Sequence, residues 1–306
     1  MGGAFREPAR RLAAALRALA LACAGVLPAA SVAVAAPQSF ESPEAAMEAF
    51  GDAVATSDEA GLRRMLGSDV RALIPPVGAE DRQRFLAAWS ESHAIQRAGQ
   101  EVAYVTAGRD GWTLPIPLVK TPAGWRFDTR AGVEEMRIRR IGRNELAVMQ
   151  TLLAIRDAQQ EYAAEYRDGD TVAKYAAKLR SSPGRRDGLY WPTAEGEKPS
   201  PLGPALAKAT PRREGKEGYH GYHYKLLTAQ GPNAPGGALD YRVRGRLFGG
   251  FAVIAWPVRY GDTGLMSFMV SHDGQLYERD LGPDSATRAL ATSRFDPGPG
   301  WRKVSP

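Results

Sequence analysis

The sequence is poor in the residues that metal binding and covalent catalysis use most often. Its 306 residues include one cysteine and four histidines. The cysteine, Cys23, lies in a segment that we expect to be removed, and a mature chain without it can form no disulfide. Its stability then has to come from a hydrophobic core. An apolar content of 44% is sufficient for such a core, and the length favours about two domains.

Motifs for nucleophilic catalysis are also missing. The chain has neither a G-x-S-x-G elbow nor an S-x-x-K sequence. The glycine-rich stretches FGGF and PGG lack the strand–loop–helix context of a nucleotide-binding loop. An acid–base pair could be drawn from His220 and one of several carboxylates, but most proteins of this size offer such combinations. We therefore expect no cofactor and a non-enzymatic role in binding or assembly, with an enzyme as the alternative.

Two histidines three positions apart in EGYHGYHYKLL, residues 217–227, raise the question of a metal site. The aromatic and apolar composition predicts a strand, in which residues three apart point to opposite faces. His220 and His223 then cannot bind the same ion, unless a bulge at Gly221 shifts the register. The other two histidines lie far away in sequence, and no carboxylate-rich pattern completes a ligand set. The sequence predicts no metal site.

The same strand assignment places three residues on one face as weak candidates for binding: His220, Tyr222 and Tyr224. A wider aromatic set can be interpreted as a platform for sugars or peptides, or as the core of a small sheet packed on a helix. That set comprises Tyr190, Trp191, Tyr219, Tyr222, Tyr224 and Trp256.

The first 35 residues have the layout of a secretory signal peptide. An arginine-rich start precedes the apolar run LALACAGVL, and small residues end in Ala33-Val34-Ala35. Cleavage after Ala35 would remove four arginines and one glutamate, which lowers the formal charge from +6 to about +3. That charge is too small to argue for nucleic acid as a partner.

Two other fates of this segment are open. It could stay as a membrane anchor, but Pro28 interrupts the short apolar run. It could be lipidated at Cys23, but Ala20 stands where a lipoprotein signal commonly has leucine. No later stretch approaches the ~20 apolar residues of a membrane span. We expect a periplasmic or secreted protein, with no membrane span after cleavage, whose partner is an envelope protein or a small ligand.

The region from residue 40 to 136 reads as helices followed by strands. Ser42 and Pro43 mark a helix start, and Ser57-Asp58 marks a second. A short strand VRALI and a helix DRQRFLAAWSESH follow, and then strands EVAYVTA, WTLPIPLVK and GWRFDTR with hairpin turns at Asp110-Gly111 and Ala123-Gly124. Three tryptophans are either pocket residues or core residues here: Trp89, Trp112 and Trp125.

The region from 142 to 304 begins with a long helix. Asn144 can cap a helix that starts at Glu145 and carries a buried stripe of Val148, Leu152, Ile155, Tyr162 and Tyr166. Gln159 falls on this stripe and, as a buried amide, needs hydrogen-bonding partners. A shorter helix VAKYAAKLRS (172–181) is predicted next. Strands GYHYKLLT, ALDYRVRGRL, GFAVIAWPV, LMSFMVS and QLYERDL follow, with turns at GPNAPGG and Asp273-Gly274.

Two basic stretches stand out. RIRRIGR, residues 137–143, is either a nucleic-acid patch or, as we favour for an exported protein, a solvated hinge between the domains. A loop-rich segment carries further basic residues that either meet an anionic envelope surface or are merely solvated. These residues are Arg185, Arg186, Arg212, Arg213 and Lys216. The sequence thus predicts an α+β protein of two domains, each with helices packed on an antiparallel sheet.

Several long stretches resemble, in the same order, a bacterial family of uncharacterised exported proteins called DUF2950. They include RRIGRNELAVMQTLLAIRDAQQEY, DGLYW, HGYHYKLLTAQGPNAPGGALDY and GGFAVIAWPVRYGDTGLMSFMVSHDGQLYERDLG. The resemblance implies export and an unassigned role.

Two parts of the chain also resemble known folds. AVATSDEAGLRRMLGSDV with the later GWRFD is similar to the nuclear transport factor 2-like cone, a fold with many functions. AIRDAQQEYAAEY with the following strands is similar to the globular part of type IV pilins, although the apolar N-terminal helix half of a pilin is lacking.

Overall fold

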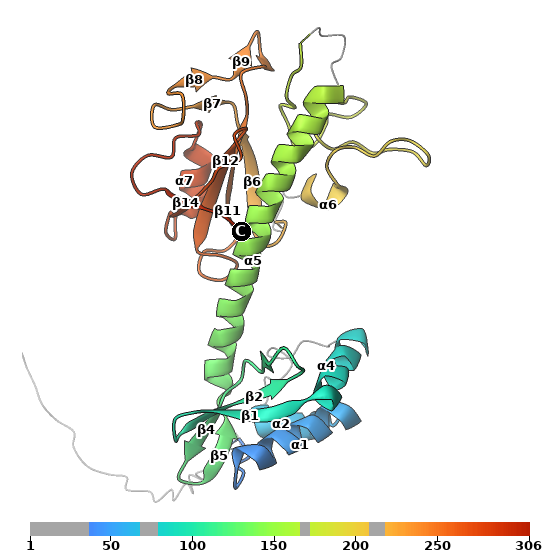
Figure 1. Ribbon diagram of the computed structural model, residues 1–306, viewed down its shortest axis with the longest axis vertical. Helices are drawn as coiled ribbons and strands as arrows, with labels where there is room; N and C mark the ends of the chain where they lie inside the picture. The colour runs from blue at the N-terminus through green and yellow to red at the C-terminus, as the bar shows by residue number, and fades with distance from the viewer. Residues whose placement is uncertain (1–36, 68–78, 166–171, 208–217) are drawn as a thin grey trace, which may run out of the picture. The chain divides into compact units, whose positions relative to one another are not determined.

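The N-terminal helices form as their capping residues predict. The computed structural model describes residues 37–67, 79–165, 172–207 and 218–306 (Figure 1). Helix α1, Pro43–Thr56, begins where Ser42 Oγ accepts a hydrogen bond from Ala45 N at 3.0 Å. Helix α2, Glu59–Leu66, begins where Asp58 accepts from Gly61 N, and helix α4, Ala79–Glu91, follows. The strand predicted at VRALI lies outside the described residues.

The N-terminal sheet is antiparallel, with the strand order β1-β2-β4-β5 and with β3 beside β2. The strands are β1 (His93–Ala98), β2 (Val102–Ala107), β3 (Trp112–Thr113), β4 (Leu118–Thr121) and β5 (Gly124–Phe127). Burial alternates along β2, so one face joins the core formed with α1, α2 and α4. The turns at Gly111 and Gly124 are confirmed, both with positive φ. Strand β1 was not predicted.

The strand predicted over WTLPIPLVK is two strands. Residues 114–117 form a bend between β3 and β4. Proline lacks the N–H that a sheet ladder needs, so Pro115 and Pro117 interrupt the pairing. The prediction of one strand was wrong because it gave β-branched and apolar composition more weight than the two prolines.

Helix α5 runs without a break from Thr129 to Glu165, which corrects two predictions. Its first turn is capped by Asp128, whose Oδ1 accepts a hydrogen bond from Ala131 N at 3.1 Å. The helix therefore does not begin at Glu145, and Asn144 is not its cap. Residues 137–143 are helical and are not a hinge. The proposed domain limits at 136 and 142 fall inside this helix, and they stay a prediction.

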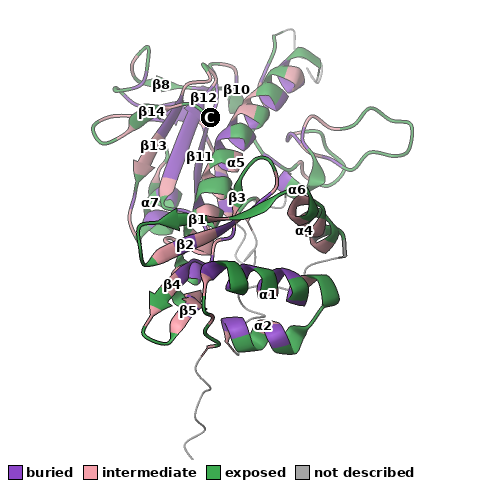
Figure 2. Cartoon of the chain, turned by 60° about the horizontal axis from the view of Figure 1, so that its bottom comes forward, coloured by how far each residue is buried: buried purple, intermediate pink, exposed green. Residues whose placement is uncertain are grey.

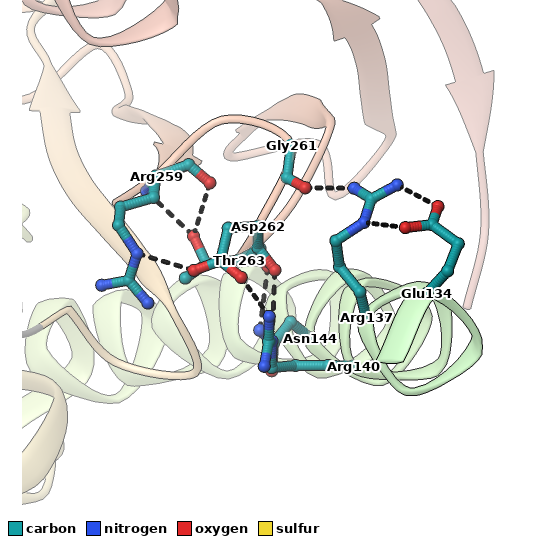
Figure 3. A network of polar contacts seen from close by, with 8 residues as sticks. All are labelled: Glu134, Arg137, Arg140, Asn144, Arg259, Gly261, Asp262 and Thr263. Carbon is teal, nitrogen blue, oxygen red and sulfur yellow. Dashed lines mark hydrogen bonds and ion pairs between the residues drawn. The ribbon is translucent and has the colours of Figure 1, made fainter. Parts of the chain in front are cut away.

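Two arginines of RIRRIGR, Arg137 and Arg140, bind the loop between β11 and β12 (Figure 3). Arg140 pairs with the Asp262 carboxylate, Arg137 donates to the carbonyl of Gly261, and Asn144 Nδ2 donates to Thr263 O at 2.8 Å. The hydrogen bond from Arg259 and the nearby charge of Arg140 outweigh partial burial and lower the pKa of Asp262. Two of the four arginines of the run therefore have intramolecular partners in this loop.

The C-terminal sheet has the order β14-β13-β12-β11-β6, with every pair antiparallel. Its strands are β6 (Tyr222–Leu227), β11 (Ala252–Pro257), β12 (Met266–Ser271), β13 (Leu276–Asp280) and β14 (Arg302–Val304). Short strands β7 (Ala229–Gln230), β8 (Leu239–Asp240), β9 (Arg242–Val243) and β10 (Arg246–Leu247) form two small ladders. Helices α6 (Pro204–Ala207) and α7 (Ser285–Ala291) complete this region, and the predicted α+β class is confirmed.

Both faces of this sheet are covered, as the colouring of β11 and β12 in Figure 2 shows. Val253 and Ala255 join the cluster that contains the buried stripe of α5. Ile254 and Trp256 point the other way and join a second cluster that includes Ala289 of α7. A strand buried on both faces reads as a continuous apolar run, which is what FAVIAWP is.

Three predictions in this region were wrong. Residues 172–181 form no helix, because their backbone groups bond to other segments, as when Tyr175 N donates to Leu247 O at 2.8 Å. The strand over ALDYRVRGRL is three short strands: β8 ends before Tyr241, and a turn at Arg244 and Gly245, both with positive φ, separates β9 from β10. His220 also has positive φ, at 50°, and belongs to a turn that precedes β6.

The apolar stripe of α5 is covered by the chain's own sheet. Val148, Leu152 and Ile155 are fully buried, and α5 packs on β12 and β11 (Figure 1). A pilus subunit would be expected to expose such a stripe, so this observation argues against that role; Tyr166 lies outside the described residues. Among the residues that the structure describes, no helix combines the length and the apolar content needed to cross a membrane.

Candidate ligand-binding site

The C-terminal region contains an open cavity of about 820 Å³ that is built almost entirely from one loop. Its volume lies within the range of small-molecule sites, roughly 300–1,000 Å³. The lining consists of residues 180–186 and 190–192: three arginines, two serines, two prolines, a glycine, a tyrosine and a tryptophan. We call it the arginine cavity.

Backbone pairing closes the loop that lines the arginine cavity. Arg180 and Tyr190 form a parallel bridge, in which Ser181 N donates to Tyr190 O at 2.8 Å and Tyr190 N donates to Leu179 O at 3.0 Å. Leu179, Leu189 and Trp191 are buried in the core beside α5. The two ends of the loop are therefore anchored in the core, and the residues between them are held over it.

Asp187 fixes the middle of the loop. Its Oδ1 accepts from Ser182 N at 2.7 Å, and its Oδ2 accepts from Lys178 Nζ at 2.7 Å and from Ser182 Oγ at 3.0 Å. Burial alone would raise the pKa of this carboxyl, but the bonds from Lys178 and Ser182 outweigh burial and lower the pKa to about 2. The carboxylate is thus the charged centre of the loop.

Gly188 closes the loop, and a larger residue does not fit there. A Cβ at this position would lie 2.6 Å from the backbone carbon of Arg180 and 2.6 Å from Ser181 N. Ser181 Oγ accepts from Gly188 N at 3.0 Å and donates to Gly188 O at 3.2 Å. The tight turn depends on this close approach of two backbone segments.

Two of the three guanidinium groups of the cavity lie over aromatic rings. Arg180 lies over the ring of Tyr190 at 5.9 Å, and Arg186 lies over the ring of Trp191 at 5.4 Å. The carbonyl of Arg186 accepts a hydrogen bond from Tyr162 Oη of α5 at 2.6 Å. No ion pair joins Arg180, Arg185 or Arg186 to a carboxylate of the described residues. Their charge is available to a ligand.

The cavity is suited to binding and poorly suited to proton transfer. Its lining contains no His, Cys, Asp or Glu. Ser182 is 2.6 Å from Lys178 Nζ, but that lysine is ion-paired with Asp187, and a lysine must be neutral to act as a base for a serine. Within the described ranges, no group of three or more His, Cys, Asp or Glu side chains could hold a metal.

Replacing Asp187 by asparagine should lower the free energy of unfolding by about 1–2 kcal/mol at pH 7. The carboxyl has a folded pKa of about 2, below the value of about 3.9 in an unfolded chain, so its contribution is present above pH ~4 and is lost as the pH falls towards 2. Urea unfolding at pH 7, 4 and 2.5 measures this.

Asp157→Asn is the matched control for that prediction, since Asp157 is exposed and, among the described residues, pairs with the neighbouring Arg156 alone. We expect the control to change stability by less than about 0.5 kcal/mol at each pH. A loss in Asp187→Asn that stays the same from pH 7 to pH 2.5 would contradict the role of the charged carboxylate.

Two of the three tryptophans predicted as pocket residues are linked through Phe85, and the third belongs to the core cluster against which Trp89 packs. Trp89 stacks on His93 with a centroid distance of 4.5 Å, and Phe85 links it to Trp112, which is 47% exposed. Trp125 is 5% exposed and lies in the core of the N-terminal region, with Arg97 at 5.7 Å from its ring. The role of these tryptophans in binding stays a prediction.

His220 is not on a strand face with Tyr222 and Tyr224. Tyr219 and Tyr222 exchange backbone hydrogen bonds of 2.9 and 3.1 Å around His220-Gly221, so the histidine lies at the tip of a tight turn and is exposed. Both Tyr222 and Tyr224 are fully buried. Burial raises the pKa of each phenol well above its usual value. The face assignment was wrong because the positive φ of His220 breaks the alternation.

Four residues that the sequence suggested in two unrelated sets lie in one cavity: Arg185, Arg186, Tyr190 and Trp191. Arg180 was missed because a helix was expected over 172–181, and no pattern in the sequence singled out Ser182 or Asp187. The dipeptide Pro183-Gly184 is a turn signal and could have revealed the loop. The other basic residues of that set, Arg212, Arg213 and Lys216, lie outside the described residues.

Comparison with known proteins gives a family and no function. The family model described as "Protein of unknown function (DUF2950)" matches residues 37–304. A search of curated proteins and a search of solved structures each found no match.

Proposed function

The chain belongs to the DUF2950 family of proteins of unknown function, and from this premise we propose that it is an exported bacterial envelope protein that binds a ligand without transforming it. The observation that carries the proposal is the arginine cavity, whose arginines form no ion pair with a described carboxylate and whose lining residues include no acid–base side chain. The proposed export is supported by the signal-like first 35 residues.

The two fold resemblances belong to the same proposal. In residues 40–128, helices followed by an antiparallel sheet are consistent with the nuclear transport factor 2-like cone. In the C-terminal region, the long helix α5 against an antiparallel sheet is consistent with the globular part of a pilin. Superposing an experimental structure on members of both folds would test this, and a different strand order in the core sheet would refute it.

Export is tested by expressing the full chain in a bacterial host, separating the cell fractions, and determining the molecular mass of the protein in each fraction by mass spectrometry. We expect a chain that starts after Ala35, found in the periplasm or the medium. A lipid on Cys23 would add the mass of its acyl groups and keep the protein with the membrane. Recovery from the cytoplasm with residues 1–35 intact would contradict export.

Binding is tested by incubating the purified protein with the small-molecule fraction of an envelope extract and analysing it by native mass spectrometry after gel filtration. We expect one ligand to be retained, to be released chemically unchanged, and to be lost from the double variant Arg185→Glu/Arg186→Glu. The control is Arg143→Glu, an exposed residue of α5 about 28 Å along the helix from Tyr162, which contacts the cavity loop.

Two results would overturn this function. If no ligand is retained, or if the released compound is chemically altered, the protein is not a simple binder. Retention that survives the double variant but is lost on Trp112→Ala would move the site to the N-terminal region, where the alternative, an enzyme with a pocket in that region, becomes the better explanation.

A further inference from the structure

We propose that the ligand of the arginine cavity is an acidic saccharide, a sugar that carries carboxylate or phosphate groups; this inference rests on the proposed function. The charge of the ligand follows from the arginines. Arg180, Arg185 and Arg186 line the cavity, and no described carboxylate neutralises them. A guanidinium presents a planar fork of donors that matches a carboxylate or phosphate in a bidentate geometry.

The arginines are oriented before the ligand arrives. Tyr190 and Trp191 hold two of the guanidinium groups at 5.9 and 5.4 Å, and the loop from Arg180 to Tyr190 is fixed by Asp187 and by the close backbone approach at Gly188. Because fewer side-chain rotations are lost on binding, a preorganised arginine gives more affinity per contact than a free one. The loop is therefore built as a receptor for anionic groups.

The rest of the lining fits a sugar better than a nucleobase. Pro183 and Pro192 offer apolar surface to the C–H face of a sugar, and Gly184, which also lines the cavity, offers backbone groups for its hydroxyl groups. A base would need a free ring face to stack on. Trp191 is only 5% exposed and already carries the Arg186 guanidinium.

The test is isothermal titration calorimetry of the full chain at low salt. The probes are digalacturonate, a neutral disaccharide, glucose 6-phosphate, inorganic phosphate, and vesicles that contain an anionic phospholipid. We expect digalacturonate or glucose 6-phosphate to bind at least about 10-fold more tightly than the neutral disaccharide and than inorganic phosphate. The affinity should fall several-fold between about 50 and 500 mM NaCl, because part of the binding is charge attraction.

Variants locate the binding. Arg186→Gln should weaken the acidic sugar about 10-fold or more, and Arg186→Lys, which keeps the charge without the fork, should weaken it less. Arg143→Gln, the same change at an exposed arginine on α5, should have no effect. Arg185→Gln provides a second variant whose side chain is exposed, in case Arg186→Gln alters folding, which circular dichroism would reveal.

The other outcomes overturn the inference. Inorganic phosphate binding as tightly as the sugars would show an anion site without a saccharide, and vesicle binding alone would show a membrane surface instead. Failure of every probe while a ligand from the envelope extract is still retained would refute the acidic saccharide and leave the proposed binding function standing. Failure of both experiments would refute the function itself.

Discussion

Replacing Gln159 by leucine is expected to lower the free energy of unfolding by about 3 kcal/mol. The Gln159 side chain is fully buried on α5 and makes two hydrogen bonds with the same residue. Its Nε2 donates to Ala176 O at 2.9 Å, and its Oε1 accepts from Ala176 N at 2.8 Å. Leucine has a similar size and would leave both backbone groups of Ala176 buried without these partners, at a cost of about 1–3 kcal/mol each.

The neighbouring position provides the control. Gln160 is exposed, so Gln160→Leu makes the same chemical change on the same helix without removing a buried bond. We expect it to alter stability by less than about 0.5 kcal/mol. Urea unfolding of both variants gives the comparison. Equal effects at the two positions would show that the amide of Gln159 does not hold the segment around Ala176.

Gln159 also explains one failure of sequence-based prediction. The alanines and lysines of residues 172–181 favour a helix by propensity. In the folded chain, both backbone groups of Ala176 are bonded to Gln159, and Tyr175 N donates to Leu247. The hydrogen bonds from the Gln159 side chain and the bridge between Tyr175 and Leu247 are contacts with distant parts of the chain, and they override the local preference for a helix. The sequence did show that Gln159 needed partners, but nothing local identified them.

The start of α5 was misplaced for a related reason. Asn144 followed by Glu145 is a good local cap, and a run of arginines before it resembles a solvated connection. The contact of Arg140 with Asp262 spans 122 positions in sequence, so no local pattern could reveal that the run lies within a helix and binds a loop. By contrast, Ser42 and Asp58 act on residues three positions away, and both caps were predicted.

Parts of the candidate site were visible in the sequence as separate features. The sequence showed two adjacent arginines, Arg185 and Arg186, which were interpreted as part of a solvated loop or a surface-binding segment. It also showed two adjacent aromatic residues, Tyr190 and Trp191, which were interpreted as a platform or as part of a sheet core. They come together because Arg180 pairs with Tyr190 and because Gly188 permits the close approach. Parallel pairing of two short segments leaves no periodic signal, so this part of the site required the structure.

Replacing Gly124 by alanine is expected to lower the free energy of unfolding by about 3–4 kcal/mol, for two reasons. Its φ of 114° is a conformation that residues with a side chain rarely adopt. A Cβ there would also lie 2.4 Å from the carbonyl oxygen of Phe40, a backbone atom that cannot rotate away. Phe40 and Trp125 exchange two hydrogen bonds of 2.7 Å beside this point, and the clash would break that pairing.

Gly111→Ala separates the two causes. Gly111 also has positive φ, 64°, but no atom lies within 4 Å of the position that a Cβ would occupy. Its variant should lose about 1 kcal/mol through backbone strain alone. Thermal or urea unfolding of the two variants therefore measures the contribution of the Phe40–Trp125 pairing as the difference between them. If both glycines give the same loss, strain at the turn is the whole effect, and the chain before α1 does not stabilise the N-terminal sheet through Trp125.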